Sequence, residues 1–245
     1  MTDAAFATME KPPIQHALIY VNPSPDSFDH AIVEAYQAEA SARGQRVVVR
    51  DLYGMGFDPL LRAVERPLHG AWSPAPDVLA ELDILRSSDI LVLVYPIWFG
   101  MPPAMLKGYV DRVLGAGYSF RDLHDQIGQE VLKHKPLLSF STSGASRPWL
   151  DEQGQILSLR EVFDVYLWRG FGMKQSEHVM IDCVVPHISQ TYAREQLERV
   201  RQVAERTCSV LASDRHSAHT AEVMARRADR PRAASIQNGA APRIP

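Results

Sequence analysis

Two aromatic residues follow directly on an apolar segment in the middle of the chain. The run Ile90–Val94 holds only apolar side chains, which predicts a strand buried on both faces, as in a parallel sheet. The chain then breaks at Pro96 into a loop with Trp98 and Phe99, and such loops project to the surface. Large aromatics there are costly unless something covers them. The loop therefore predicts a wall for a flat ligand; the alternative is that both rings belong to the core.

A second loop carries groups that suit a phosphate. The segment from Asn22 to Phe28 precedes a predicted helix, and Ser27 and the amide groups at a helix start can bind an anion. The alternative, favoured on this loop alone, is that Asp26 or Ser27 only caps the helix. The sequence has neither the glycine fingerprint of dinucleotide-binding folds nor the Walker lysine loop, which argues against those classes.

A third loop is rich in small polar residues. It runs from Ser141 to Arg147 as Ser-Thr-Ser-Gly-Ala-Ser-Arg, and its amides and hydroxyls can reach the polar edge of a flat ring. Together the three loops offer a phosphate end, an apolar stacking face and a polar ring edge. That combination describes a ligand like flavin mononucleotide.

Alternating strands and helices must bring these loops together. The apolar patterns predict strands over 16–21, 46–51, 90–94, 136–142 and 174–184, and helices over 28–42, 75–87, 103–114, 155–169 and 191–212. This alternation predicts an α/β fold with a doubly wound, five-stranded parallel sheet and helices on both faces. Right-handed crossovers favour the order 2-1-3-4-5. The first, third and fourth strands are then neighbours, so their carboxyl-end loops meet in one crevice.

Composition narrows the class of protein. The net charge of −3 gives no footprint for nucleic acid. No apolar run approaches the roughly 20 residues of a membrane span, and no signal peptide is evident, so we expect a cytoplasmic protein without membrane insertion. Cys183 and Cys208 fall in a predicted strand and helix, which indicates reduced thiols. We expect a flexible segment over 1–15, one domain over 16–213 and a disordered tail over 214–245.

Several segments resemble the NAD(P)H:quinone oxidoreductase (DT-diaphorase) family. They are Ala17–Val21, Ser27-Phe28, Asp51–Leu60, Tyr95–Gly108 and Leu138–Gly144, and they run in family order over about residues 16–212. The resemblance implies a flavodoxin-like fold, bound FAD (with FMN as the alternative), NAD(P)H as co-substrate and a homodimer with its sites at the interface.

The resemblance also implies roles for particular residues. The cofactor-binding residues would be Asn22, Ser27, Phe28, Pro96, Ile97, Trp98, Phe99, Ser141, Thr142, Ser143 and Gly144. Of these, Ser27 and Phe28 would lie at the pyrophosphate, and Trp98 would line the face used for hydride transfer. Tyr118 and Phe120 correspond to an aromatic pair that closes the partner's pocket in the family.

The chain departs from the family in three places. Asn22 stands where the family has His, and Ser143 replaces a Gly. After Gly144 the family's Tyr and His, which assist charge relay, have no match. We expect Trp149 to occupy the space of that Tyr, and hypothesise that Arg147 supplies charge beside the reduced flavin; the alternative is a surface arginine.

The remaining polar residues give weaker signals. The histidines at 124, 134, 178 and 187 show no ligand spacing, so we expect surface or packing roles and no metal site. Asp111 and Arg112 are expected to form a solvated pair.

The expected function is therefore a flavin-dependent NAD(P)H oxidoreductase. It would pass electrons to a quinone or similar two-electron acceptor by a ping-pong mechanism. The alternatives are an azo- or nitro-reductase, a redox-sensing regulatory subunit of a potassium-efflux-type transporter and, less favoured for this near-neutral chain, a one-electron carrier.

Overall fold

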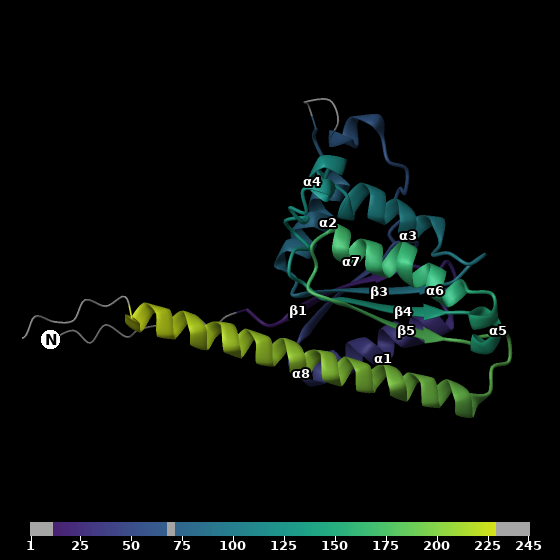
Figure 1. The fold of residues 1–245 in the computed structure, drawn as a ribbon. Helices are drawn as coiled ribbons and strands as arrows, with labels where there is room; N and C mark the ends of the chain where they lie inside the picture. Colours follow the sequence, from purple (N-terminus) through teal and green to yellow (C-terminus); the bar gives the residue numbers. More distant parts are fainter. Residues whose placement is uncertain (1–11, 68–71, 229–245) are drawn as a thin grey trace, which may run out of the picture.

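A five-stranded parallel sheet forms the centre of the molecule (Figure 1). The computed structural model describes residues 12–67 and 72–228. The strands are β1 (Gln15–Tyr20), β2 (Arg46–Asp51), β3 (Ile90–Pro96), β4 (Leu137–Thr142) and β5 (Ser176–Ile181). Their order is β2-β1-β3-β4-β5 and every pair is parallel. The predicted fold class and strand order are confirmed.

Helices cover both faces of the sheet. On one face lie α1 (Phe28–Ala42) and α8 (Gln190–Ala228), side by side in Figure 1. The other face carries α2 (Pro76–Ser87), α3 (Ala104–Tyr109), α6 (Gln155–Leu159) and α7 (Tyr166–Gly170), with π-helical turns η3 (Val110–Leu114) and η4 (Arg160–Val165). Short helices η1 (Ala63–Glu65), α4 (Phe120–His124) and α5 (Arg147–Glu152) lie in the connections.

Each face of the sheet has its own apolar core. Alternate strand residues point to opposite faces, so Leu91 and Leu93 pack beneath α2 and η3, while Val92 and Val94 pack beneath α1 and α8. β1, β3 and β4 are buried along their whole length, whereas β5 is an edge strand and is only partly buried. The central strands therefore hold the loops at their carboxyl ends on a rigid base.

Some predicted boundaries differ from the structure. β3 continues through Tyr95 and Pro96, because Pro96 lies at the strand's end, where its missing N–H costs little. The predicted helix over 103–114 changes to π-helix at Val110, and α5 was not predicted. The predicted strand over 174–184 is too long, so Cys183 lies exposed in the loop after β5, not in a strand.

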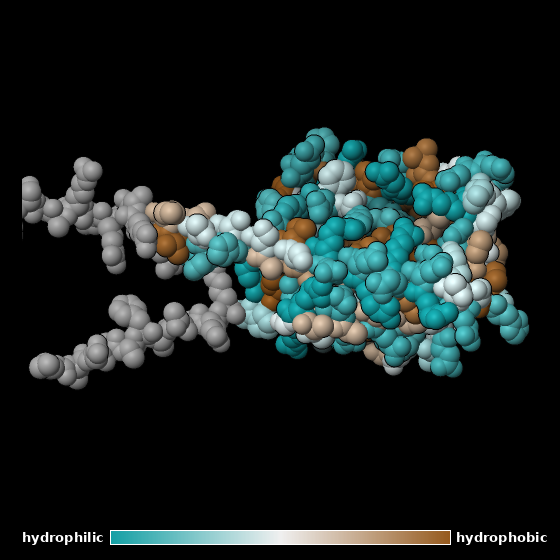
Figure 2. All heavy atoms as spheres, turned by 90° about the horizontal axis from the view of Figure 1, so that it is seen from below, coloured by the Kyte–Doolittle hydropathy of each residue, from teal (hydrophilic) through white to brown (hydrophobic). Residues whose placement is uncertain are grey.

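The last helix is longer than the sequence pattern indicates. α8 continues past the predicted boundary at Asp214 to Ala228, although Leu211 is the last buried residue of the described chain. The helix runs well beyond the body of the molecule in Figure 1. Seen from below in Figure 2, the body of the molecule is mostly hydrophilic, whereas the projecting end of the helix mixes hydrophilic and hydrophobic residues. No helix in the described ranges is long and apolar enough to cross a membrane, and the rest of the expected tail, 229–245, lies outside those ranges.

Two of the segments that carry the family resemblance pack against each other. A Cβ atom at Gly108 of α3 would lie 2.3 Å from the Cβ atom and 2.4 Å from the carbonyl oxygen of Pro59. Only glycine fits this approach of α3 to the segment after β2. The two distant segments therefore form one packing unit.

Arg112 is not solvated, contrary to the expectation for the pair with Asp111. It is 4% exposed, and its guanidinium donates to buried Glu65 and to Asp77, with Nη2–Oε1 and Nη1–Oδ2 distances of 2.8 and 2.9 Å. Asp111 pairs instead with Lys107. The error has a physical cause: the π-helical turn places Arg112 under η1 and α2, a turn that local spacing does not reveal.

Candidate functional site at the carboxyl edge of the sheet

The loops after β1, β3 and β4 are joined by backbone hydrogen bonds. The Val21 amide donates to the Val94 carbonyl at 2.9 Å, and the Ile97 amide donates to the Thr142 carbonyl at 2.7 Å. The Ser143 amide extends the series to Ile181 of β5 at 2.9 Å. The three predicted loops therefore share one edge of the sheet, as the strand order requires.

A buried carboxylate ties the first and third loops together. Asp29 is almost completely buried at the start of α1. It accepts hydrogen bonds from the Asn22 side-chain amide at 2.7 Å and from the Thr142 hydroxyl at 2.8 Å. Burial raises the pKa of Asp29, while the two hydrogen bonds oppose that rise. Asp29 was missed because an acidic residue in a first helical turn is common; its partners become neighbours only in the fold.

The N-terminus of α1 has the geometry of an anion site. Ser27 caps the helix by accepting from the His30 amide, and its hydroxyl lies 3.0 Å from that of Tyr20. Among the described residues, the amides of Phe28 and Asp29 have no partner. The capping role of Ser27 is therefore observed, and the cap leaves two amides at the helix start for an anion; the role of Ser27 at a phosphate stays a prediction. The Asn22 side chain is already engaged by Asp29 and by the Ser24 amide.

The aromatic loop turns outward. Trp98 and Met101 exchange backbone hydrogen bonds of 3.0 Å, and Phe99 adopts a φ of +49°. The side chain of Phe99 is fully exposed and Trp98 is 41% exposed. The alternative that both rings belong to the core is therefore wrong. The exposed apolar faces of Trp98 and Phe99 are accessible for contact with a flat ligand.

The third loop offers backbone and hydroxyl groups at the same edge. Ser143 is buried, and its hydroxyl accepts from the Ala145 amide at 3.2 Å. A Cβ atom at Gly144 would approach nothing closer than the Val184 carbonyl oxygen, at 3.7 Å. A side chain at Gly144 would thus meet its neighbours at ordinary contact distance, so the backbone at this position is not crowded.

Tyr118 and Phe120 lie away from these loops within one chain. They line a separate cavity of about 580 Å³ between η3, α4, η4 and α7, and its lining includes no residue of the three loops. The Tyr118 hydroxyl donates to the Gly170 carbonyl at 2.7 Å, whereas Phe120 is largely exposed. The structure of one chain does not bring this pair to the aromatic loop.

Arg147 is the last residue of the predicted third loop and the first residue of α5, and Trp149 follows it in that helix. The Arg147 amide donates to Asp182 at 2.7 Å, which fixes the start of the helix. Its exposed guanidinium lies 3.8 Å from Asp151 and lines a pocket with two other arginines. Trp149 is half exposed. Both stand near the third loop, and the roles proposed for them stay predictions.

His178 belongs to a buried network that sequence reasoning missed. Its Nε2 lies 2.6 Å from the Ser141 hydroxyl, and its Nδ1 lies 2.6 Å from a carboxylate oxygen of Asp164. The other oxygen of Asp164 accepts from Ser139 at 3.1 Å. Nearby, the buried Tyr95 hydroxyl has no hydrogen-bond partner in the described structure, and burial raises its pKa well above its ordinary value. The network was invisible because Asp164 lies in π-helical η4.

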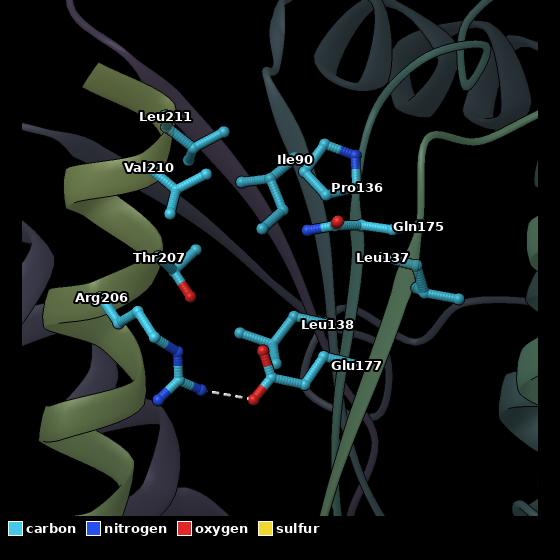
Figure 3. Close-up of a pocket in the computed structure, with 10 residues that line it drawn as sticks. All are labelled: Ile90, Pro136, Leu137, Leu138, Gln175, Glu177, Arg206, Thr207, Val210 and Leu211. Carbon is cyan, nitrogen blue, oxygen red and sulfur yellow. Dashed lines mark hydrogen bonds and ion pairs between the residues drawn. The ribbon is translucent and has the colours of Figure 1, made fainter. Parts of the chain in front are cut away.

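Other features fit a cofactor poorly. The cavity in Figure 3 lies at the opposite, amino edge of the sheet, where an Arg206–Glu177 ion pair borders it. At about 100 Å³ it is smaller than typical ligand pockets of roughly 300–1,000 Å³. Within the described ranges, no group of three or more His, Cys, Asp or Glu side chains is placed to hold a metal ion.

The residues at the carboxyl edge fit a flavin. Free helix-start amides suit a phosphate, the exposed Trp98 and Phe99 suit the face of a tricyclic ring, and the uncrowded backbone at Gly144 suits its polar edge. In open α/β sheets, ligands bind at this edge.

The fold and this edge define a flavodoxin-like protein. The family model described as flavodoxin-like fold matches residues 15–204, and the chain belongs to that family. The chain is 29% identical over 202 residues to an uncharacterized NAD(P)H oxidoreductase of Haemophilus influenzae, covering 82% of this chain and 97% of that protein.

Two further proteins extend the comparison. Ribosyldihydronicotinamide dehydrogenase (quinone) of Rattus norvegicus is 32% identical over 149 residues, covering 53% of this chain and 63% of that protein. The solved structure of an NAD(P)H:quinone oxidoreductase from Methanothermobacter marburgensis has a TM-score of 0.69 at 24% identity, covering 79% and 98% of the two chains. The resemblance read from the sequence is confirmed.

Proposed function

We propose that this protein is a flavin-dependent NAD(P)H oxidoreductase that reduces a quinone or similar two-electron acceptor. The observation that carries the proposal is the outward pair Trp98 and Phe99 beside the free amides of α1. The names of the Haemophilus and rat relatives support the same chemistry.

The chain's own groups would divide the work of binding. The amides of Phe28 and Asp29 would hold a phosphate, with Asp29 linking that site to the third loop through Asn22 and Thr142. Trp98 and Phe99 would cover the ring and exclude water, and the backbone of Ser143 and Gly144 would meet its polar edge. When bound, the flavin supplies hydride acceptance from NAD(P)H and two-electron delivery to the acceptor.

We favour FAD over FMN and a ping-pong sequence in which donor and acceptor occupy one face in turn. Absorbance of the purified protein tests the cofactor: bands near roughly 375 and 450 nm that NAD(P)H bleaches are expected of a flavin enzyme. Chromatography of the released cofactor separates FAD from FMN. A colourless protein that neither flavin reconstitutes would overturn the proposal.

A matched pair of variants tests the aromatic wall. Trp98→Ala should weaken flavin binding about tenfold, since stacking contributes roughly 0.5–1.5 kcal/mol beyond buried area. Trp72→Ala is the control, because Trp72 is 37% exposed, close to the 41% of Trp98, but lies outside the three loops. Equal flavin affinity in the two variants would remove Trp98 from the site.

Steady-state assays with a panel of acceptors test the reaction. We expect soluble quinones to turn over fastest and the lines in double-reciprocal plots to be parallel, as a ping-pong sequence requires. Faster turnover of azo or nitro compounds would move the protein to that class of reductase.

We further propose a homodimer that covers the exposed apolar side chains around Tyr118. Phe120, Val162 and Tyr166 line the cavity of about 580 Å³ and are all exposed in the single chain. A second copy seated there would bury them and complete a pocket. Light scattering during size-exclusion chromatography should give twice the chain mass of 27.4 kDa, and a monomer at micromolar concentration would contradict it.

A further inference from the structure

Three arginines from three different helical segments line one cavity at the open edge of the sheet. The cavity measures about 270 Å³ and lies beside the outer edge of β5, the last strand of the sheet. Its lining comprises Arg147, Ile156, Leu159, Arg160, Asp164, Ser176, His178, Met180 and Arg199. It includes no residue of the first two loops and one residue of the third, Arg147, which is also the arginine expected beside the flavin.

The charge in this cavity is positive and poorly compensated. Among the residues that the structure describes, the Arg147 guanidinium has Asp151 as its one partner, 3.8 Å away, and Arg199 donates to the Met180 carbonyl at 3.4 Å. Arg160 has no side-chain partner within the described part of the chain. Guanidinium groups that are not paired at close range are available for a ligand.

The one carboxylate in the lining, Asp164, forms no ion pair with these arginines in the described structure. Both oxygens of Asp164 are engaged in hydrogen bonds, one with His178 at 2.6 Å and the other with Ser139 at 3.1 Å. The second nitrogen of His178 is taken by Ser141. The imidazole is therefore a fixed wall, and the arginines are the groups left to bind an anion.

The remaining lining is apolar and limits the ligand's size. Ile156, Leu159 and Met180 contribute hydrophobic surface, which an inorganic ion would leave uncovered. At roughly 30 Å³ for the volume of one water, about 270 Å³ holds a molecule of about nine non-hydrogen atoms. The planar guanidinium fork matches a carboxylate with two parallel hydrogen bonds.

We propose that this cavity binds a small organic carboxylate whose compact apolar body rests on Ile156, Leu159 and Met180, while the arginines hold its charged end. The inference goes beyond the proposed flavin chemistry: of the residues expected at the flavin it uses Arg147 alone, and its test rests on Arg160, which lies in none of the three loops.

Calorimetric titration of the purified full chain with benzoate tests the site. Benzoate should bind at a single site, and benzamide, which has the same shape without the charge, should bind at least tenfold more weakly. In the amide spectrum of the isotope-labelled protein, benzoate should shift the signals of His178 and Met180. Absence of benzoate binding at millimolar concentration would overturn the proposal.

A pair of arginine variants tests whether benzoate binds in this cavity or is attracted by the positive charge of any arginine. Arg160→Gln should weaken benzoate binding at least tenfold, whereas Arg121→Gln, an exposed arginine of α4 outside the cavity, should leave it unchanged. Equal affinity in the two variants would overturn the assignment. Inorganic phosphate that competes as tightly as benzoate would show that the apolar surface is not used, and would overturn the ligand class.

Discussion

Arg112 shows how one side chain can hold several segments together. It lies at η3 and bonds to Glu65 of η1, to Asp77 of α2 and to the Asp58 carbonyl. Its aromatic neighbour is Phe57, with the guanidinium carbon 5.3 Å from the ring centroid. The ion cluster therefore attaches η1 and the residues before it to α2 and η3, beside the apolar contacts of Leu52 and Phe57.

Replacing Arg112 should destabilise the protein strongly. Arg112→Met leaves the Glu65 carboxylate buried without its partner, which costs about 3–5 kcal/mol. Arg62→Met is the control: it breaks an exposed pair with Asp58 and should cost less than about 1 kcal/mol. Urea denaturation measures both, and equal midpoints would contradict the role given to the buried cluster.

The ion cluster of Arg112, Glu65 and Asp77 should make the free energy of unfolding depend on pH. The hydrogen bonds from Arg112 lower the pKa of Glu65 below its ordinary value of 4.5. When folding lowers the pKa of a carboxyl group, the group stabilises the folded protein fully at any pH above its pKa in the unfolded chain. This stabilisation is lost as the pH falls through the pKa of the group in the folded protein. Glu65→Gln should therefore reduce the loss of stability between neutral pH and about pH 3. Glu198→Gln, which removes an exposed carboxylate, should not change that slope.

Individual site residues were predictable where the signal was local. The apolar strand and proline break before Trp98, and the position of Ser27 before a helix, were visible in the sequence, and both residues lie at the carboxyl edge of the sheet. Asp29, His178 and Arg112 were missed or misread because their partners are distant in the chain: Asp29–Thr142, His178–Asp164 and Arg112–Glu65 form only after folding.

Among the helices, α3 depends on a close approach that only glycine permits. Gly108→Ala places a methyl group within 2.3–2.4 Å of Pro59. The rigid backbone there cannot yield cheaply, so we expect a loss of about 1–3 kcal/mol from overpacking, despite the better helix propensity of alanine.

Gly170→Ala is the matched control for that variant. Its added methyl group would meet only the tip of the flexible Leu123 side chain, at 3.0 Å, so stability should change little. Thermal unfolding of both variants is the measurement, and a Gly108→Ala protein as stable as the parent would contradict the packing described.

Strands were easier to predict than helices on the second face of the sheet. Uninterrupted apolar runs marked β1 and β3, and the start of α1 was predicted to the residue. The helical segment from Gln155 to Gly170 contains π-helical η4, where the wider turn changes which residues face the core. The 3.6-residue spacing of apolar side chains predicts that a helical segment is present, but it does not predict which residues of a π-helical turn face the core.

At the scale of the whole molecule, the two ends of α8 differ in how much of their surface is buried. α8 contributes buried residues to the core on this face of the sheet as far as Leu211, and Arg215 still pairs with Asp89 at 2.8 Å. From 212 to 225 no residue is buried. Amide hydrogen exchange should therefore be much faster over 216–225 than over 197–211, although both are helical. Equal protection would show that a second copy or another partner covers the end of α8.

Ser141 and Thr142 point to opposite faces of the sheet, one bonded to His178 and the other to Asp29. A substitution of Ser141 or Thr142 would therefore break a hydrogen bond on one face of the sheet or on the other. Ser143 is the exception, since within the described ranges its side chain bonds to Ala145 alone, two positions along. An engineer who wishes to retune the loop without disturbing either core should begin with Ser143 alone.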